Sequence, residues 1–147
     1  MKRIAQYKKL FAVEGELELR QLKKTYRNLV KEWHPDKFLE GDAKKEEAEE
    51  MSRKIIDGYH FLVSIAPETK EANLEEYKTD VESGLVDFEH KNVRLEVTFG
   101  NGATYEYFGV PKNIFIKLIN SDKRQRFAKR SIFNSYLYRK SEKEIDA

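Results

Sequence analysis

The stretch ELRQLKKTYRNLVKEWHPDK, residues 18–37, decides how the first half of the chain folds. Its apolar residues recur at three- and four-residue steps, which predicts one apolar stripe on a helix: Leu19, Leu22, Tyr26, Leu29 and Trp33. Pro35 has no N–H and pushes His34 out of helical geometry, so the helix should end at Trp33. Because Pro35 also fixes its own φ, we expect His34 and Asp36 to lie on a stiff loop that loses little freedom on binding.

A basic face is expected on the same helix, away from the apolar stripe. Arg20, Lys24, Arg27 and Lys31 are spaced 4, 3 and 4 residues apart, which places them on one side. Like charges at this spacing cost roughly 0.2–0.5 kcal/mol per pair, so helix stability does not explain them. Two interpretations stay open here: a solvated face that ends in an ordinary helix stop, or a docking surface for an acidic partner.

Helical spacing continues on both sides of this stretch. A short first helix carries Tyr7 and Phe11, and a further apolar stripe runs from Ala48 to Leu62. Two long helices with facing stripes predict an antiparallel pair, which the short helix can cover on one side. The polar segment 67–83 is expected to be a linker with some helix around residues 72–78.

Strand patterns replace helical ones after this linker. Apolar residues alternate with polar ones over 93–99, and the hairpin signal GNG (100–102) joins this strand to a second, TYEYF (104–108). Two helices are expected to follow, at 110–121 and from about residue 122 to 138. The predicted fold class is therefore α+β, with an antiparallel hairpin or meander and two helices after the N-terminal helix pair. The predicted domains are 1–66, the linker 67–83, a second domain at 84–140 and a tail at 141–147.

The register of the hairpin decides where its tyrosines lie. An odd loop over 100–102 pairs Val97 with Tyr105 and Leu95 with Tyr107, and leaves Glu96 opposite Glu106 on the solvent face. An even loop would bury a glutamate at a cost of a few kcal/mol or more. The like-charge pair on a wet face costs only roughly 0.2–1 kcal/mol. We therefore expect Tyr105 and Tyr107 in the core, with a base-stacking role as the alternative.

Charge and composition limit the possible functions. The chain of 147 residues has no cysteine, which excludes disulfides and thiolate chemistry. It shows no apolar leader segment and no apolar run that could span a bilayer, so we expect a soluble cytoplasmic protein. Residues 1–85 carry 16 Lys and Arg against 18 Asp and Glu, and residues 86–147 carry 12 against 8. A basic second half permits a nucleic-acid partner without requiring one.

The second half contains a set of basic residues for which we expect a solvated helix surface, with phosphate contacts as the alternative: Lys123, Arg124, Arg126, Lys129 and Arg130. The three histidines, His34, His60 and His90, are too scattered to suggest a metal site. No nucleophile elbow, P-loop or dinucleotide-binding loop is present. We therefore expect no enzyme activity, no metal and no cofactor.

Three segments together resemble the J-domain, the co-chaperone module of the DnaJ family, over about residues 4–64. They are YKKLFAV (7–13), the basic helix with its HPD tripeptide (18–37), and KIIDGYHFL (54–62). The resemblance implies that His34, Pro35 and Asp36 trigger ATP hydrolysis by a DnaK-class chaperone. It implies docking on that chaperone by a set of basic residues: Arg20, Lys23, Lys24, Arg27 and Lys31.

The chain also departs from this family. Phe11 stands where the family usually has glycine, and Gly58 replaces a common alanine. The HPD tripeptide is intact, which argues against a degenerate domain that only holds a partner. No Gly/Phe-rich linker, zinc module or client-binding β-domain follows, so the second domain is expected to select partner or location.

The segment 84–140 resembles the KTSC domain, named for the C-terminus of some lysyl-tRNA synthetases. The resemblance rests on LEVTFGNGATYEYFGVP (95–111) and the helices after it. It implies a fold rather than an activity. It leaves open an alternative function, an RNA- or ribosome-associated binding protein in which the J-like part serves as a scaffold.

Overall fold

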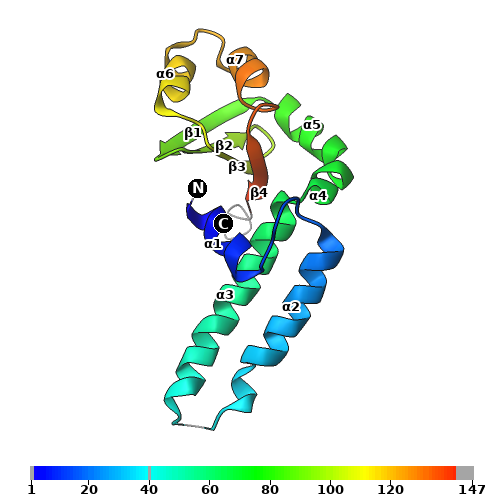
Figure 1. Ribbon diagram of the computed structural model, residues 1–147. Helices are drawn as coiled ribbons and strands as arrows, with labels where there is room; N and C mark the ends of the chain where they lie inside the picture. Colours follow the sequence, from blue (N-terminus) through cyan, green and yellow to red (C-terminus); the bar gives the residue numbers. More distant parts are fainter. Residues whose placement is uncertain (1, 40, 142–147) are drawn as a thin grey trace. The chain divides into compact units, whose positions relative to one another are not determined.

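The computed structural model describes residues 2–39 and 41–141, and within them the chain is mixed α+β (Figure 1). Helices come first and antiparallel strands follow, as the sequence predicts, but the sheet has four strands where the sequence predicts two. The chain divides into two compact units, one of residues 2–71 and one that begins at Ala72. In the described part of the chain, no helix is both long and apolar enough to cross a membrane.

The first unit is an antiparallel pair of long helices, α2 and α3, with the short α1 against α3. Its elements are α1 (Lys2–Leu10), α2 (Leu19–Trp33), the 3-10 turn η1 (Pro35–Lys37), α3 (Ala43–Ile65) and α4 (Pro67–Ala72). The first N–H of α2, at Leu19, donates to Glu68 Oε1 at 2.7 Å, so a side chain of α4 satisfies one of its unpaired donors. Asp42 caps α3 by accepting the Lys44 N–H at 2.9 Å.

The core of this unit explains one pair of departures from the J-domain pattern. A Cβ atom on Gly58 would lie 2.9 Å from Tyr7 Cδ1 and 3.1 Å from Phe11 Cε1. Phe11 is 2% exposed, and its ring occupies the space that an alanine methyl would need at position 58. The large residue at 11 and the glycine at 58 therefore compensate for each other in volume.

The second unit is a β-meander with its helices on one face of the sheet. Its elements are α5 (Leu74–Glu82), β1 (Leu85–Lys91), β2 (Arg94–Phe99), β3 (Thr104–Phe108), α6 (Lys112–Asn120), α7 (Arg124–Ser131) and β4 (Leu137–Ser141). The strand order is β1-β2-β3-β4, with every pair antiparallel. The helices contribute Tyr77, Val81, Leu118 and Ala128 to the core beneath them.

The β2–β3 hairpin has the predicted register. Val97 pairs with Tyr105, Leu95 with Tyr107, and Glu96 with Glu106. The prediction that the two glutamates lie on a wet face was wrong, because Glu106 is only 2% exposed. Its carboxylate accepts from Arg94 Nε on β2 and from Arg139 Nη1 on β4.

These arginines set the charge state of Glu106. Burial alone would raise the pKa of its carboxyl, but the hydrogen bond and charge of Arg94, joined by those of Arg139, leave that pKa below its usual value. An ion-paired carboxylate can therefore occupy this buried position.

The segment 67–83, predicted as a partly helical linker, is almost entirely helical. It forms α4 and α5, and α5 buries Tyr77 and Val81 in the core of the second unit. The second unit therefore begins before the predicted boundary at residue 84.

The end of the second unit also differs from the sequence prediction. The helix expected to reach residue 138 ends at Ser131, and β4 follows and pairs with β3. Ser141 closes β4, while the rest of the predicted tail, 142–147, lies outside the described residues. His90 lies in β1, where its ring stacks on Phe115 with centroids 4.7 Å apart.

Candidate functional site: a basic helix that ends in an exposed turn

The tripeptide His34–Asp36 forms an exposed turn at the end of α2. His34 leaves helical geometry at φ −61° and ψ 125°, as the proline after it requires. The 3-10 turn η1 is closed by two backbone bonds, Lys37 N–H to the His34 carbonyl at 3.0 Å and Phe38 N–H to the Pro35 carbonyl at 3.1 Å. The loop is therefore fixed by hydrogen bonds as well as by the proline ring.

The two polar side chains of this turn face solvent. The Asp36 side chain is 89% exposed and that of His34 is 50% exposed. His34 Nδ1 accepts the Asp36 N–H at 3.2 Å and lies 3.5 Å from Asp36 Oδ2. A neutral ring that accepts at Nδ1 carries its proton on Nε2, so the turn presents both an N–H donor and a carboxylate to a partner.

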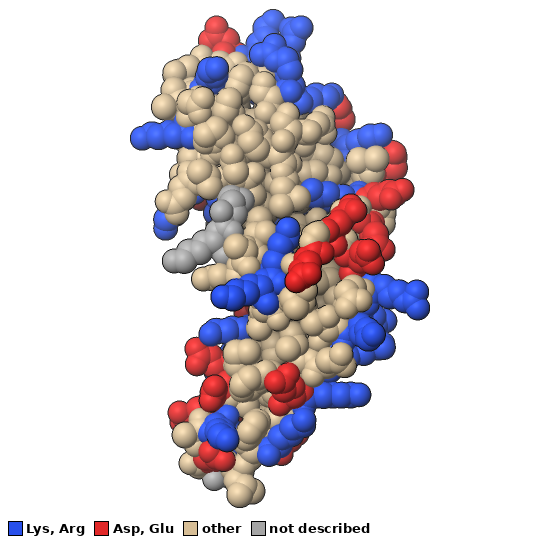
Figure 2. Space-filling view, in the orientation of Figure 1, with Lys and Arg blue, Asp and Glu red and all other residues tan. Residues whose placement is uncertain are grey.

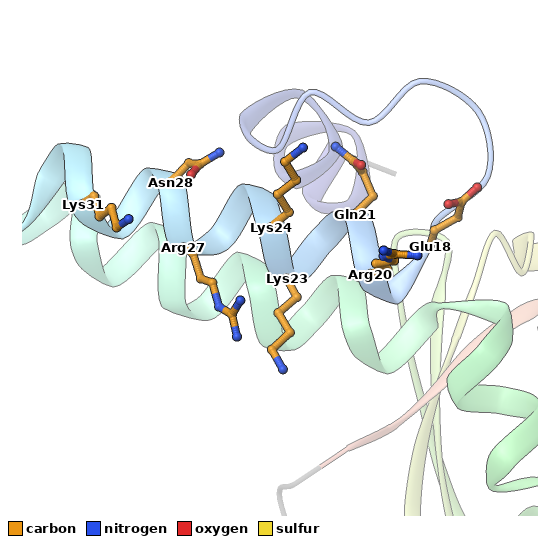
Figure 3. A pocket seen from close by; sticks show the side chains of 8 residues that line it. All are labelled: Glu18, Arg20, Gln21, Lys23, Lys24, Arg27, Asn28 and Lys31. Carbon is orange, nitrogen blue, oxygen red and sulfur yellow. The ribbon is translucent and has the colours of Figure 1, made fainter.

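All five basic residues that the sequence places on a docking helix line one shallow groove along α2, of about 520 Å³. They are Arg20, Lys23, Lys24, Arg27 and Lys31. Figure 3 shows Lys23 and Arg27 reaching to one side of the helix, while Gln21, Lys24 and Asn28 reach to the other. An acidic surface laid along α2 would therefore meet ammonium or guanidinium groups on both sides.

Gln21 and Asn28 were missed by the sequence analysis, which considered only charges. The seven-residue step between these two amides places them on one side of α2, so helical spacing was the signal that could have found them. Their side-chain amides can donate to or accept from a partner between the cations.

The two long helices of the first unit differ in net charge, because α2 carries five Lys and Arg against one Glu, whereas α3 carries four against five Asp and Glu. In the view of Figure 2, Lys and Arg side chains follow the edge formed by α2, and most of the Asp and Glu side chains of the lower part lie over α3. The glutamates at the start of α3 explain the acidic side: Glu46, Glu47, Glu49 and Glu50. A negatively charged partner is therefore steered toward α2 and the turn that ends it.

Tyr105 and Tyr107 do not form a base-stacking surface, and that alternative was wrong. The two residues are 3% and 0% exposed. The Tyr105 hydroxyl donates to Asp80 Oδ2 at 2.5 Å, and the Tyr107 hydroxyl lies 2.9 Å from that of Tyr77. Burial, and then the bond to Asp80, raise the pKa of the Tyr105 hydroxyl far above its usual value.

The basic residues around α7 are exposed but do not converge on one site. Arg124 Nη2 donates to the Ile119 carbonyl at 2.9 Å, so it caps the end of α6. Lys129 Nζ lies 2.5 Å from Glu82 Oε1. Lys123, Arg126 and Arg130 keep their charges toward solvent, as the solvated-surface interpretation expects.

No group of three or more His, Cys, Asp or Glu side chains within residues 2–39 and 41–141 is arranged to hold a metal ion. His60 lies exposed on α3, and His90 is half-buried in β1, where its Nε2 lies 2.8 Å from the Val110 carbonyl oxygen.

The fold and site define a two-unit chain: a helical unit with a basic helix, α2, and a His-Pro-Asp turn, followed by a small α+β unit. The family model of the KTSC domain matches residues 85–136, within the second unit. Over 56 residues the chain is 39% identical to the tetratricopeptide repeat and J domain-containing co-chaperone DNJ1 of Fusarium oxysporum f. sp. lycopersici. This match covers 38% of the chain and 11% of that relative, so the chain spans a small part of the length of that protein.

Proposed function

We propose that this chain is a J-domain co-chaperone that docks on a DnaK-class chaperone and stimulates its ATP hydrolysis. The observation that carries the proposal is the exposed His34–Asp36 turn, held by backbone hydrogen bonds at the end of a helix whose outer face is basic. The similarity to a J-domain co-chaperone supports the same class of function.

In this proposal the ATPase carries out the chemistry, and the chain supplies no catalytic group. The basic groove of α2 contacts an acidic surface of the chaperone and sets the orientation of the turn. His34 and Asp36 then bind groups that control hydrolysis, and the stiffness of the turn keeps the entropy lost on docking small. The KTSC unit selects the partner or location to which the chaperone is recruited. We place this activity in the cytoplasm.

A single-turnover ATP hydrolysis assay with a DnaK-class chaperone tests the proposal. We expect stimulation by the wild-type chain and none by Asp36→Asn. This substitution removes one charge from an exposed turn, so the free energy of unfolding should change by no more than about 0.5 kcal/mol. Glu32→Gln is the matched control, because it removes an exposed charge one turn earlier, outside the groove and the turn. Failure of the wild type with several cognate chaperones would reject the proposal.

RNA binding by the second unit has less support than co-chaperone activity. Two of the five candidate cations, Arg124 and Lys129, have partners inside the unit, and the two candidate tyrosines are buried. Binding of single-stranded RNA relies on exposed aromatic faces together with phosphate contacts. The geometry therefore favours a solvated surface on α7.

A further inference from the structure

Leu39 lies in the loop that joins the His-Pro-Asp turn to α3, and its side chain is 82% exposed. It is the most exposed large apolar side chain in the described part of the chain. Single exposed apolar residues are common on protein surfaces and need no function by themselves. The position of Leu39 in this loop, and the way its backbone is held, distinguish it from such residues.

Phe38 and Leu39 both take part in backbone hydrogen bonds. Phe38 has extended backbone geometry, φ −117° and ψ 143°, so its side chain and that of Leu39 point to opposite sides of the chain. Phe38 is half-buried, while Leu39 faces solvent. The Phe38 N–H donates to the Pro35 carbonyl at 3.1 Å, and the Leu39 carbonyl accepts the Asp42 N–H at 3.0 Å. The leucine is thus presented beside the turn by residues whose own backbone groups are hydrogen-bonded.

A partner that covers Asp36 must also come close to Leu39. Three residues of chain span at most about 10 Å, whereas a protein interface of ordinary size covers about 800 Å² on each partner. The rest of the proposed docking surface is polar: the basic groove, His34, Asp36 and the exposed Lys37. Interfaces commonly combine such a polar surround with a few apolar anchors that carry much of the affinity.

We propose that Leu39 is an apolar anchor for the DnaK-class ATPase, which inserts beside the His-Pro-Asp turn and sets affinity without taking part in the trigger. This inference rests on the proposed function and adds a residue to the same docking surface. It requires an apolar depression on the ATPase next to the site that receives Asp36.

The test is a titration of the full-length chain in the single-turnover assay. Leu39→Ala should raise the concentration for half-maximal stimulation roughly tenfold, because it removes most of the buried apolar surface, and leave the maximal rate unchanged. Leu39→Met should restore the wild-type concentration, since it keeps an apolar side chain of similar size. Ile56→Ala, which shortens a side chain on α3 that is 41% exposed, should behave as wild type.

Each other result would overturn the anchor. An unchanged half-maximal concentration for Leu39→Ala would mean that the leucine touches nothing on the ATPase. A lower maximal rate at saturation would place it in the trigger instead. If even the wild type gave no stimulation, the proposed function would fail. The anchor would then be tested by measuring direct binding of wild type and Leu39→Ala to the immobilised ATP-bound chaperone. Equal affinity, or no binding by either chain, would then overturn the anchor as well.

Discussion

Gly58 and Phe11 share one volume in the helical unit, which makes their effects on stability interdependent. In a helix, glycine is usually about 0.5–1 kcal/mol less favourable than alanine. Here an added methyl would meet Tyr7 at 2.9 Å and Phe11 at 3.1 Å. Overpacking of a core typically costs about 1–3 kcal/mol, which exceeds the gain in helix propensity.

We therefore expect Gly58→Ala to destabilise the helical unit by about 1 kcal/mol, although it improves helix propensity. In a Phe11→Leu background the same change should cost less, with a coupling of at least about 0.5 kcal/mol in a double-mutant cycle. Urea unfolding of the four chains measures this coupling. Strict additivity would show that Phe11 does not compete with the methyl for space.

Asp80 is a second residue with a definite expected effect, because its buried carboxylate holds three elements together. It accepts Asn101 Nδ2 at 2.7 Å and the Tyr105 hydroxyl at 2.5 Å, and Lys140 Nζ lies 3.4 Å away. Burial alone would raise the pKa of Asp80, but the bonds from Tyr105 and Asn101 and the charge of Lys140 leave that pKa below its usual value. The ionised form therefore stabilises the folded second unit.

This stabilisation is complete above the pKa of an unfolded aspartate, about 3.9, and is lost as the pH falls through the lower folded value. Asp80→Asn should destabilise the second unit by about 1–3 kcal/mol at neutral pH and flatten the loss of stability below about pH 4. Thermal melts across pH measure both effects. Asp122→Asn, at an exposed position, is the control and should change neither. If Asp80→Asn lost stability just as steeply as the pH fell, the loss of stability in acid would be due to other groups, such as Glu106.

At the scale of elements, local signals were enough for α2 and not for β4. The bounds of α2 were predicted to the residue because its apolar period and the proline that ends it lie within one stretch. β4 was missed because its residues continue the helical pattern of the residues before them. They form a strand only because they pair with β3. α5 was predicted as mainly linker because its buried side consists of three residues, Tyr77, Asp80 and Val81, among charged ones.

The positions of α5 and β4 predict where the second folding unit begins and ends. The KTSC match, 85–136, leaves out both α5 and β4. It therefore omits Tyr77, whose ring stacks on that of Tyr138 at 4.1 Å, and one whole strand of the sheet. We expect residues 74–141 to fold cooperatively and residues 85–136 to remain unfolded, as measured by amide dispersion in NMR spectra. A well-dispersed spectrum for 85–136 would mean that α5 and β4 are accessory.

The α2 helix carries a further prediction, about its charge. Arg27→Gln should weaken docking on the ATPase several-fold, mainly through slower association, and the difference from wild type should shrink as salt screens the charges. Because it relieves like-charge repulsion along the groove, it should leave the helix as stable or gain about 0.2–0.5 kcal/mol. Association rates at two salt concentrations measure the effect, with Arg53→Gln on α3 as the control. A loss that does not depend on salt would indicate a packing role for Arg27.

At the scale of the whole molecule, the two units differ in how far their sites could be predicted. The residues of the first site are adjacent in sequence or share one helix face, so the structure brings all of the basic residues to one groove. In the second unit the contacts are non-local: Asp80 and Tyr105 are 25 residues apart, and Lys129 meets Glu82 across 47 residues. No periodic pattern indicates such pairings, so the sequence could not show that Arg124 and Lys129 have partners inside the unit.

The division into two units also predicts a division of labour. The turn, the basic groove and Leu39 all lie within residues 2–71, whereas the KTSC match lies entirely in the second unit. We expect residues 2–71 alone to stimulate the ATPase to the same maximal rate, at a similar half-maximal concentration, as the full chain. Asp80→Asn in the full chain should likewise leave stimulation unchanged, because it weakens only the second unit. If a folded 2–71 fragment stimulated poorly and Asp80→Asn also impaired stimulation, these results together would mean that the second unit acts on the chaperone itself and does not only direct it to a partner.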